Sequence, residues 1–222
     1  RGGGGVALDK FAMLQNSIVF ANSNLSAPLS EPPYSGGGVF ISDHSFGVVV
    51  RNCRFTRNRT LGIGGGVCVD GNTTIGNCIF NYNIARVGGG GFALAAGNSI
   101  DLVNCTFYRN SASQNDHYSI ISFGDLNILN CIVSRGILVD RVNNKFYSIN
   151  STYSLIQEVT VAGGTGNIVA NPLFVDPENS DFRLEAESPA INAGHPGNEY
   201  KDSNGSRNDM GAYGGPYGDD WE

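Results

Sequence analysis

Charged residues are scarce in this 222-residue chain, where they make up 15% of the sequence against about 25% in an average soluble domain. A run of about 18 consecutive apolar residues is also missing, which excludes an apolar helix that crosses a membrane. Acidic residues outnumber basic ones. The net charge of −6 therefore argues against nucleic acid as a partner, because phosphate binding requires a basic face.

The two ends of the chain differ in character. Eleven of the 20 acidic residues lie from Asp176 onward, which is typical of a solvated surface that keeps a protein soluble. The other end shows no signal peptide, because the sequence starts at Arg1 and enters a glycine run at once. We therefore expect the sequence to be a processed or trimmed piece of a longer protein.

Glycine is abundant, with 31 residues against a usual share of roughly 7%. Four glycine runs, each followed by alternating apolar residues, begin at Gly3, Gly36, Gly64 and Gly89. A second pattern alternates with them: an apolar residue, any residue, Asn, then Cys or Ser, any residue, and an apolar residue. It is centred on Asn16, Asn52, Asn77, Asn104 and Asn130.

The spacing of this second pattern predicts the fold. The cysteines that follow the last four asparagines are 25, 27 and 26 residues apart. A period near 26 built from short alternating strands, without helical periodicity, describes one coil of a solenoid. The sequence predicts an all-β, single-stranded, right-handed parallel β-helix over residues 1–187. Residues 188–222 are predicted to form an irregular C-terminal cap and tail of the same domain, because the last coil of a solenoid needs covering.

Aligning the repeats on the asparagine gives three apolar columns that we expect to point inward. They are Leu14, Val50, Ile75, Leu102 and Ile128; Ser17, Cys53, Cys78, Cys105 and Cys131; and Val19, Phe55, Phe80, Phe107 and Val133. The asparagine must then lie at a bend, whose left-handed conformation Asn tolerates well. Stacked about 4.8 Å apart, the side chains of Asn16, Asn52, Asn77, Asn104 and Asn130 can bond to one another as an asparagine ladder.

Four of the five cysteines belong to one of these inward columns. We expect them to be reduced core residues, since parallel side-chain directions would strain a disulfide between neighbouring coils. Cys68 differs, because it shares a column with Ala7, Phe40 and Ala93 that should face outward or lie at a strand edge. It is predicted to be the accessible thiol.

The motifs resemble those of known bacterial proteins. Glycine pairs alternate with Phe-x-x-Asn at Phe55–Asn58, Phe80–Asn83 and Phe107–Asn110. These features resemble the repeats of polymorphic outer-membrane proteins, although the first coil has Val19 and Asn22 in the motif's places. Asn171–Phe174, Ser188–Gly194 and Asp209–Gly215 resemble segments of secreted, pectate-lyase-like bacterial β-helix proteins. The resemblance implies a β-helix at the cell surface or outside the cell, but no activity, because this scaffold carries lyases, hydrolases, adhesins and spacers.

Two pairs of residues are candidates for catalysis. Arg51 and Arg54 share a coil, with Arg57 and Arg59 in the following turn; these arginines could meet an acidic glycan or form a solvated basic turn. Asp9 and Asp70 occupy equivalent places one to two coils apart, which corresponds to about 5–10 Å. That separation suits the carboxylate pair of a glycosidase, but aspartate at a strand end is also ordinary turn chemistry.

One segment is a candidate metal site. Oxygen-bearing side chains alternate before a glycine in the stretch that contains Asp202, Asn204 and Asp209, and the pattern resembles part of a calcium loop. It departs from the EF-hand, because Tyr200 stands where the first Asp should be and no Glu closes the loop. A tight Asn-Gly turn without calcium is the other interpretation.

Three function classes stay open at this stage. The first is a non-enzymatic extracellular or cell-surface β-helix with a structural, adhesive or glycan-binding role, whose partners are polysaccharides or other surface proteins. The second is a polysaccharide lyase or glycoside hydrolase that acts on acidic glycans. The third is a filament subunit that self-associates through its solenoid ends, because unpaired strands at Gly2–Leu8 must be covered.

Overall fold

The structure, a computed structural model, describes residues 3–25, 35–95, 98–112, 118–135, 137–139, 141–142, 145–146, 149–157 and 164–221. Within these ranges the regular elements are strands and two 3₁₀ turns, η1 (Pro177–Asn179) and η2 (Asn198–Tyr200). A search of the same residues for a helix long and apolar enough to cross a membrane found none.

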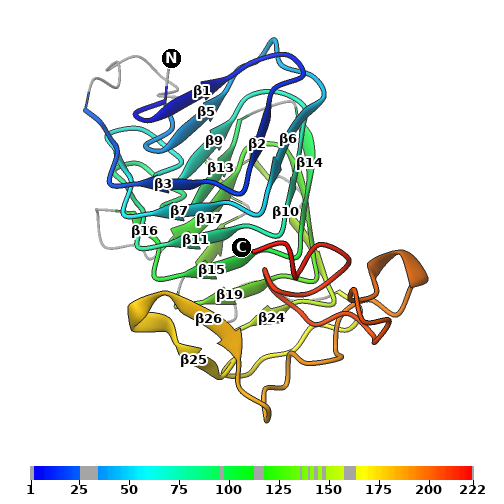
Figure 1. Cartoon of the computed structure of the whole chain (residues 1–222). Coiled ribbons are helices and arrows are strands. Elements are labelled where there is room, and N and C mark those ends of the chain that lie inside the picture. Colours follow the sequence, from blue (N-terminus) through cyan, green and yellow to red (C-terminus); the bar gives the residue numbers. More distant parts are fainter. Residues whose placement is uncertain are drawn as a thin grey trace.

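Successive coils place their short strands side by side in parallel sheets, which are stacked around one core (Figure 1). The first sheet contains β1 (Val6–Leu8), β5 (Val39–Ile41), β9 (Val67–Val69), β13 (Phe92–Leu94), β17 (Tyr118–Ser122) and β20 (Ile137–Val139). The second contains β2 (Met13–Gln15), β6 (Val48–Arg51), β10 (Thr73–Gly76), β14 (Ser99–Val103), β18 (Asp125–Leu129) and β23 (Ile149–Thr152).

Two further sheets complete the coils. The third contains β3 (Ile18–Phe20), β7 (Arg54–Thr56), β11 (Ile79–Asn81), β15 (Thr106–Tyr108), β19 (Ile132–Ser134) and β24 (Leu155–Ile156). The fourth contains β4 (Ser23–Asn24), β8 (Arg59–Thr60), β12 (Ile84–Ala85) and β16 (Ser111–Ala112). An antiparallel pair, β21 (Arg141–Val142) and β22 (Lys145–Phe146), branches off after the first sheet's last strand. The predicted all-β parallel solenoid is confirmed.

Members of all three predicted columns lie in the core, and apolar residues of the first sheet, such as Val39, Val67 and Phe92, fill the rest of it. Phe55, Phe80 and Phe107 stack on successive coils, with ring centroids 4.9 and 4.5 Å apart and no exposed surface. Beside them lie four fully buried cysteines that form no disulfide bond, namely Cys53, Cys78, Cys105 and Cys131. Burial is the main reason that the thiol pKa is raised at the last three of these.

The prediction for Cys68 is wrong, because this thiol has no exposed surface. It points away from the main core into a small second cluster on the outer side of the first sheet, with Phe40, Ala93 and Ile121 from neighbouring strands. Ile63, from the segment that precedes Gly64, covers the cluster. An outward position in a strand is therefore buried here by the connecting loop.

At two corners, the first five coils bend through a left-handed residue that is not glycine. At the first bend, between the second and third sheets, the five predicted asparagines have φ between 48° and 55°. At the second bend, after the third sheet, the same conformation is adopted by Ala21, Arg57, Tyr82, Arg109 and Arg135, with φ between 48° and 56°. Non-glycine residues other than Asn, Asp and His seldom adopt it, and its recurrence shows how strongly the stacked coils impose this bend.

A continuous asparagine ladder is present at the second bend, not at the first. Side-chain amides join Asn22 to Asn58, Asn58 to Asn83 and Asn83 to Asn110, with N···O distances of 2.9–3.0 Å. The side chains of Asn58, Asn83 and Asn110 have no exposed surface. In the predicted first-bend column, one side-chain hydrogen bond joins two of the asparagines within the described residues. Asn130 Nδ2 donates to Asn104 Oδ1 at 3.4 Å.

The amides of the first-bend column are bonded instead to the end of the chain. Asn52 donates to the carbonyl of Tyr217, Asn77 to those of Ala212 and Gly214, and Asn104 to that of Asp209. The segment predicted as a cap thus runs back along the coils, and in Figure 1 its red end lies in front of β15 and β19. We call residues 188–221 the C-terminal arm.

An antiparallel hairpin of β25 (Phe174–Asp176) and β26 (Asp181–Leu184) precedes the arm. Together, hairpin and arm form a second apolar layer against the outer side of the third sheet. The layer contains Ile79, Tyr108, Ile132 and Leu155 from the sheet and Phe174, Phe182, Ala190, Met210 and Ala212 from the end of the chain. This layer explains why the outward column of the third sheet carries so little charge.

Candidate functional site

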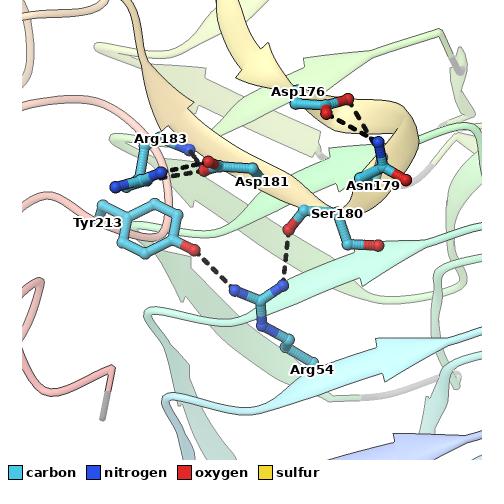
Figure 2. Close-up of polar contacts among 7 residues, drawn as sticks. All are labelled: Arg54, Asp176, Asn179, Ser180, Asp181, Arg183 and Tyr213. Atoms are coloured by element: carbon cyan, nitrogen blue, oxygen red, sulfur yellow. Dashed lines mark hydrogen bonds and ion pairs between the residues drawn. The ribbon is translucent and has the colours of Figure 1, made fainter.

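The two arginines proposed for catalysis are engaged by the C-terminal arm and the hairpin. The Arg51 guanidinium lies 3.8 Å from the ring centroid of Tyr217. Arg54 donates to the carbonyl of Ser180 and to the hydroxyl of Tyr213, both at 2.7 Å (Figure 2). Both side chains therefore fasten the end of the chain to the second coil, and the structure does not present them together on an open surface.

Asp9 and Asp70 lie at the same place on the first and third coils, with Ser42 between them. Two coil steps separate their backbone positions by about 10 Å, which is beyond the spacing of a retaining glycosidase and close to the upper end of that of an inverting one. Asp9 accepts hydrogen bonds from the Lys10 N–H and the Ser42 hydroxyl, and these bonds, the first above all, lower the pKa of its carboxyl. Asp70 is 8% exposed. A general acid needs a raised pKa, so Asp9 does not fit that role.

The candidate calcium residues are held in a hydrogen-bonded turn. The carboxylate of Asp202 accepts from the main-chain N–H groups of Asp209 and Gly215 and from the Ser206 hydroxyl. Asn204 accepts from the N–H of Ser206, and Asp209 accepts from the N–H of Asn192. The described residues contain no group of three or more His, Cys, Asp and Glu that could hold a metal. The segment therefore forms a hydrogen-bonded turn around Asp202, and calcium binding by Asp202, Asn204 and Asp209 stays a prediction.

A groove that the sequence did not predict lies along the second bend. It has a volume of about 730 Å³ and is open to solvent, and it is lined by Tyr82, Ile84, Arg109, Asn110, Ser111, Arg135 and Gln157. Three left-handed bend residues of successive coils, Tyr82, Arg109 and Arg135, belong to this lining. Arginine and tyrosine therefore recur at the spacing of the coils, about 4.8 Å.

Aromatic rings and guanidinium groups alternate along this wall. The Arg57 and Arg109 guanidinium groups each lie 5.9 Å from the centroid of the Tyr82 ring. Arg109 and Arg135 lie 5.4 and 5.8 Å from the centroid of Tyr108. Cation–π attraction at these distances orients the long arginine side chains, which would otherwise rotate freely.

A single carboxylate, that of Glu178 on η1, is bound at the wall of the groove. Its Oε2 accepts from the hydroxyl of Tyr82 at 2.7 Å and from Arg109 Nη1 at 2.9 Å. Its Oε1 accepts from the hydroxyl of Tyr108 at 3.0 Å and from Arg109 Nη2 at 2.9 Å. The bond from Tyr82, followed by those from Tyr108 and the charge of Arg109, lowers the pKa of Glu178. Burial and the bond to Glu178 raise the pKa of both tyrosines.

The groove lies on a basic flank of an acidic protein. Arg59 and Arg86 line a neighbouring hollow of about 250 Å³, next to Ile84. With Arg57, Arg109 and Arg135 they place five of the chain's 14 basic residues along one corner. Guanidinium groups bind carboxylate or sulfate with two parallel hydrogen bonds, and aromatic faces pack against sugar rings or cations. The arrangement can therefore bind an extended anion.

Part of this site was visible in the sequence. Arg57, Tyr82, Arg109 and Arg135 each stand two places after the third inward column, so the column could have been found by extending the alignment by two places. Glu178 is far away in the sequence, so no spacing connects it to the column.

Comparisons of the chain with protein-family models, with curated proteins and with solved structures found no match. The likeness to outer-membrane repeats and to pectate-lyase-like proteins thus rests on the motifs alone.

Proposed function

We propose that this chain is an extracellular or cell-surface β-solenoid that binds acidic polysaccharide in the groove of the second bend, without cleaving it. The observation that carries the proposal is the column of Arg57, Tyr82, Arg109 and Arg135 on successive coils. A linear acidic polymer presents charges at regular intervals, and a column of cationic side chains repeated every coil offers it several contacts at once. The rigid solenoid would hold the column in place at no cost when the ligand binds.

The competing classes have less support. An acidic-glycan lyase or hydrolase would need the candidate arginines free to meet substrate, whereas Arg51 and Arg54 bind the end of the chain. A filament subunit would use the exposed strands of the first coil, where Met13, Ile18 and Phe20 are exposed. Nothing in the structure indicates what covers them.

The test is a binding titration with polygalacturonate, alginate and hyaluronan, with neutral dextran as the reference polymer. We expect the wild-type protein to bind at least one acidic polymer, more weakly as salt is raised. Arg135→Ala should weaken this binding at least tenfold, since a charge-assisted hydrogen bond is worth about 1.5–3 kcal/mol. This substitution keeps the Cβ atom, so the strain at the left-handed bend is unchanged.

Lys201→Ala is the matched control, because it removes one exposed positive charge from the C-terminal arm, away from the groove. Equal weakening by the two variants, or binding to dextran as tight as to the acidic polymers, would contradict the proposal. Absorbance of unsaturated sugar products in the same samples reports lyase activity and would favour the enzyme class.

A further inference from the structure

Glu178 occupies the part of the groove wall that is best suited to a foreign carboxylate. Both of its oxygens accept two hydrogen bonds each, from Tyr82, Tyr108 and the two terminal nitrogens of Arg109. Two hydroxyl groups and one guanidinium thus converge on a single carboxylate and saturate it. Such a fork-to-fork pair with arginine is the geometry with which proteins bind carboxylates of ligands.

The turn that presents Glu178 is fixed from both sides. Asp176 accepts hydrogen bonds from the main-chain and side-chain nitrogens of Asn179, and Pro177 stiffens the start of the turn (Figure 2). The next residue, Ser180, is left-handed and is tied to the coils by Arg54 and by Asn81. The hairpin therefore fixes the backbone of Glu178 next to the groove, and the position of its carboxylate follows from that of the turn.

The contact is nevertheless open to exchange. The side chains of Arg109 and Glu178 are 36% and 55% exposed, so water screens their attraction and an ion in solution can approach them. Ion pairs of this exposure are weak. A carboxylate on a polymer already held by neighbouring arginines would compete with Glu178 at a high effective concentration.

We propose that Glu178 is an internal competitor, which occupies the carboxylate position of the groove until a carboxylate of the ligand replaces it. The inference rests on the proposed function and adds its regulation: the hairpin lowers the affinity of the groove for isolated anions and leaves it open to polymers that bind several coils. When the ligand binds, Glu178 turns into solvent, while Tyr82, Tyr108 and Arg109 keep their positions.

The test measures binding of polygalacturonate and of its fully methyl-esterified form to Glu178→Gln. Glutamine keeps the size of the side chain but has one acceptor oxygen in place of two and no charge. We expect polygalacturonate to bind about fivefold more tightly, the change that release from one exposed ion pair allows. The esterified polymer, which has no free carboxylates, should gain nothing.

Glu187→Gln is the matched control, because it changes the net charge equally from an exposed position outside the groove. The gain from Glu178→Gln should also vanish in an Arg109→Ala background, since the group it frees is then absent. A gain that is equal in the two glutamine variants, or that persists without Arg109, would overturn the proposal.

The two proposals fail in distinguishable ways. If neither the wild-type protein nor Glu178→Gln binds any acidic polymer, the proposed function and the role of Glu178 are both overturned. If the wild-type protein binds through Arg135 but Glu178→Gln behaves as Glu187→Gln does, the groove is still the binding site, and only the proposal that Glu178 competes with the ligand is overturned. Matching near-ultraviolet circular dichroism of the variants would show that each is folded.

Discussion

Replacing Asn83 with alanine removes a middle rung of the buried asparagine ladder. The Asn83 side chain accepts hydrogen bonds from the main-chain and side-chain nitrogens of Asn58, both at 3.0 Å. It donates to the carbonyl of Phe55 at 2.7 Å and to Asn110 Oδ1 at 2.9 Å. The substitution leaves the Asn58 N–H without this acceptor and the Phe55 carbonyl without this donor, in a place that water does not reach.

A buried polar group left without a partner costs about 1–3 kcal/mol, so the free energy of unfolding should fall by about 3 kcal/mol. The matched control is Asn127→Ala, which breaks a rung of the same kind on the outer side of the second sheet. Asn127 joins Asp101 to Asn150 on neighbouring coils, and both of these partners are exposed. Water can replace the lost bonds there, so the expected change is within about 0.5 kcal/mol.

Equilibrium unfolding in urea, followed by far-ultraviolet circular dichroism, measures both values. An equal fall in the free energy of unfolding in the two variants would refute the argument, because burial would then add nothing to the stabilisation by the asparagine hydrogen bonds. A change in the slope of the transition for Asn83→Ala alone would indicate that the coils no longer unfold together.

Three further predictions follow from the contacts of the described residues. Arg54→Ala should loosen the C-terminal arm, because it removes the bonds to Ser180 and Tyr213; limited proteolysis should cut the arm while the coils stay intact, and a wild-type digestion pattern would contradict this. A thiol reagent should modify none of the five cysteines in the native protein and all of them after unfolding, and rapid labelling of Cys68 in the native state would refute its burial. The stabilising contacts of Glu178 should be complete above about pH 4.3, its ordinary pKa, and lost as the pH falls through its lower folded pKa. The stability difference between the wild-type protein and Glu178→Gln should then shrink below that pH, and a difference that is constant down to acid pH would contradict it.

The coils could be predicted from the sequence because the residue patterns that define them are local and repeat along the chain. A spacing near 26 residues, alternating apolar residues and an asparagine at the first bend of five successive coils are all readable in the chain. The same repetition left the ladder ambiguous, since the first four coils have an asparagine at both bends. Which of them bonds to its neighbours depends on whether its side chain points into the core, as that of Asn83 does, or outward to the arm, as that of Asn77 does.

The contacts of the C-terminal region were not predictable, because no periodicity connects it to the coils. Arg51 and Arg54 appear in the sequence as exposed positive charges, and only the path of the arm shows that Tyr217 and Tyr213 cover them. Cys68 poses the same problem on a smaller scale. A strand position that alternation assigns to solvent is buried when a connecting loop, here with Ile63, folds over it.

The most direct test of the groove as a binding site is a crystal structure of the protein soaked with an oligogalacturonate of three or more residues. We expect difference density along the second bend, with a ligand carboxylate within hydrogen-bond distance of Arg135 and a sugar ring against Tyr82. Density for the ligand on another face, or an empty groove at a saturating concentration, would contradict the account.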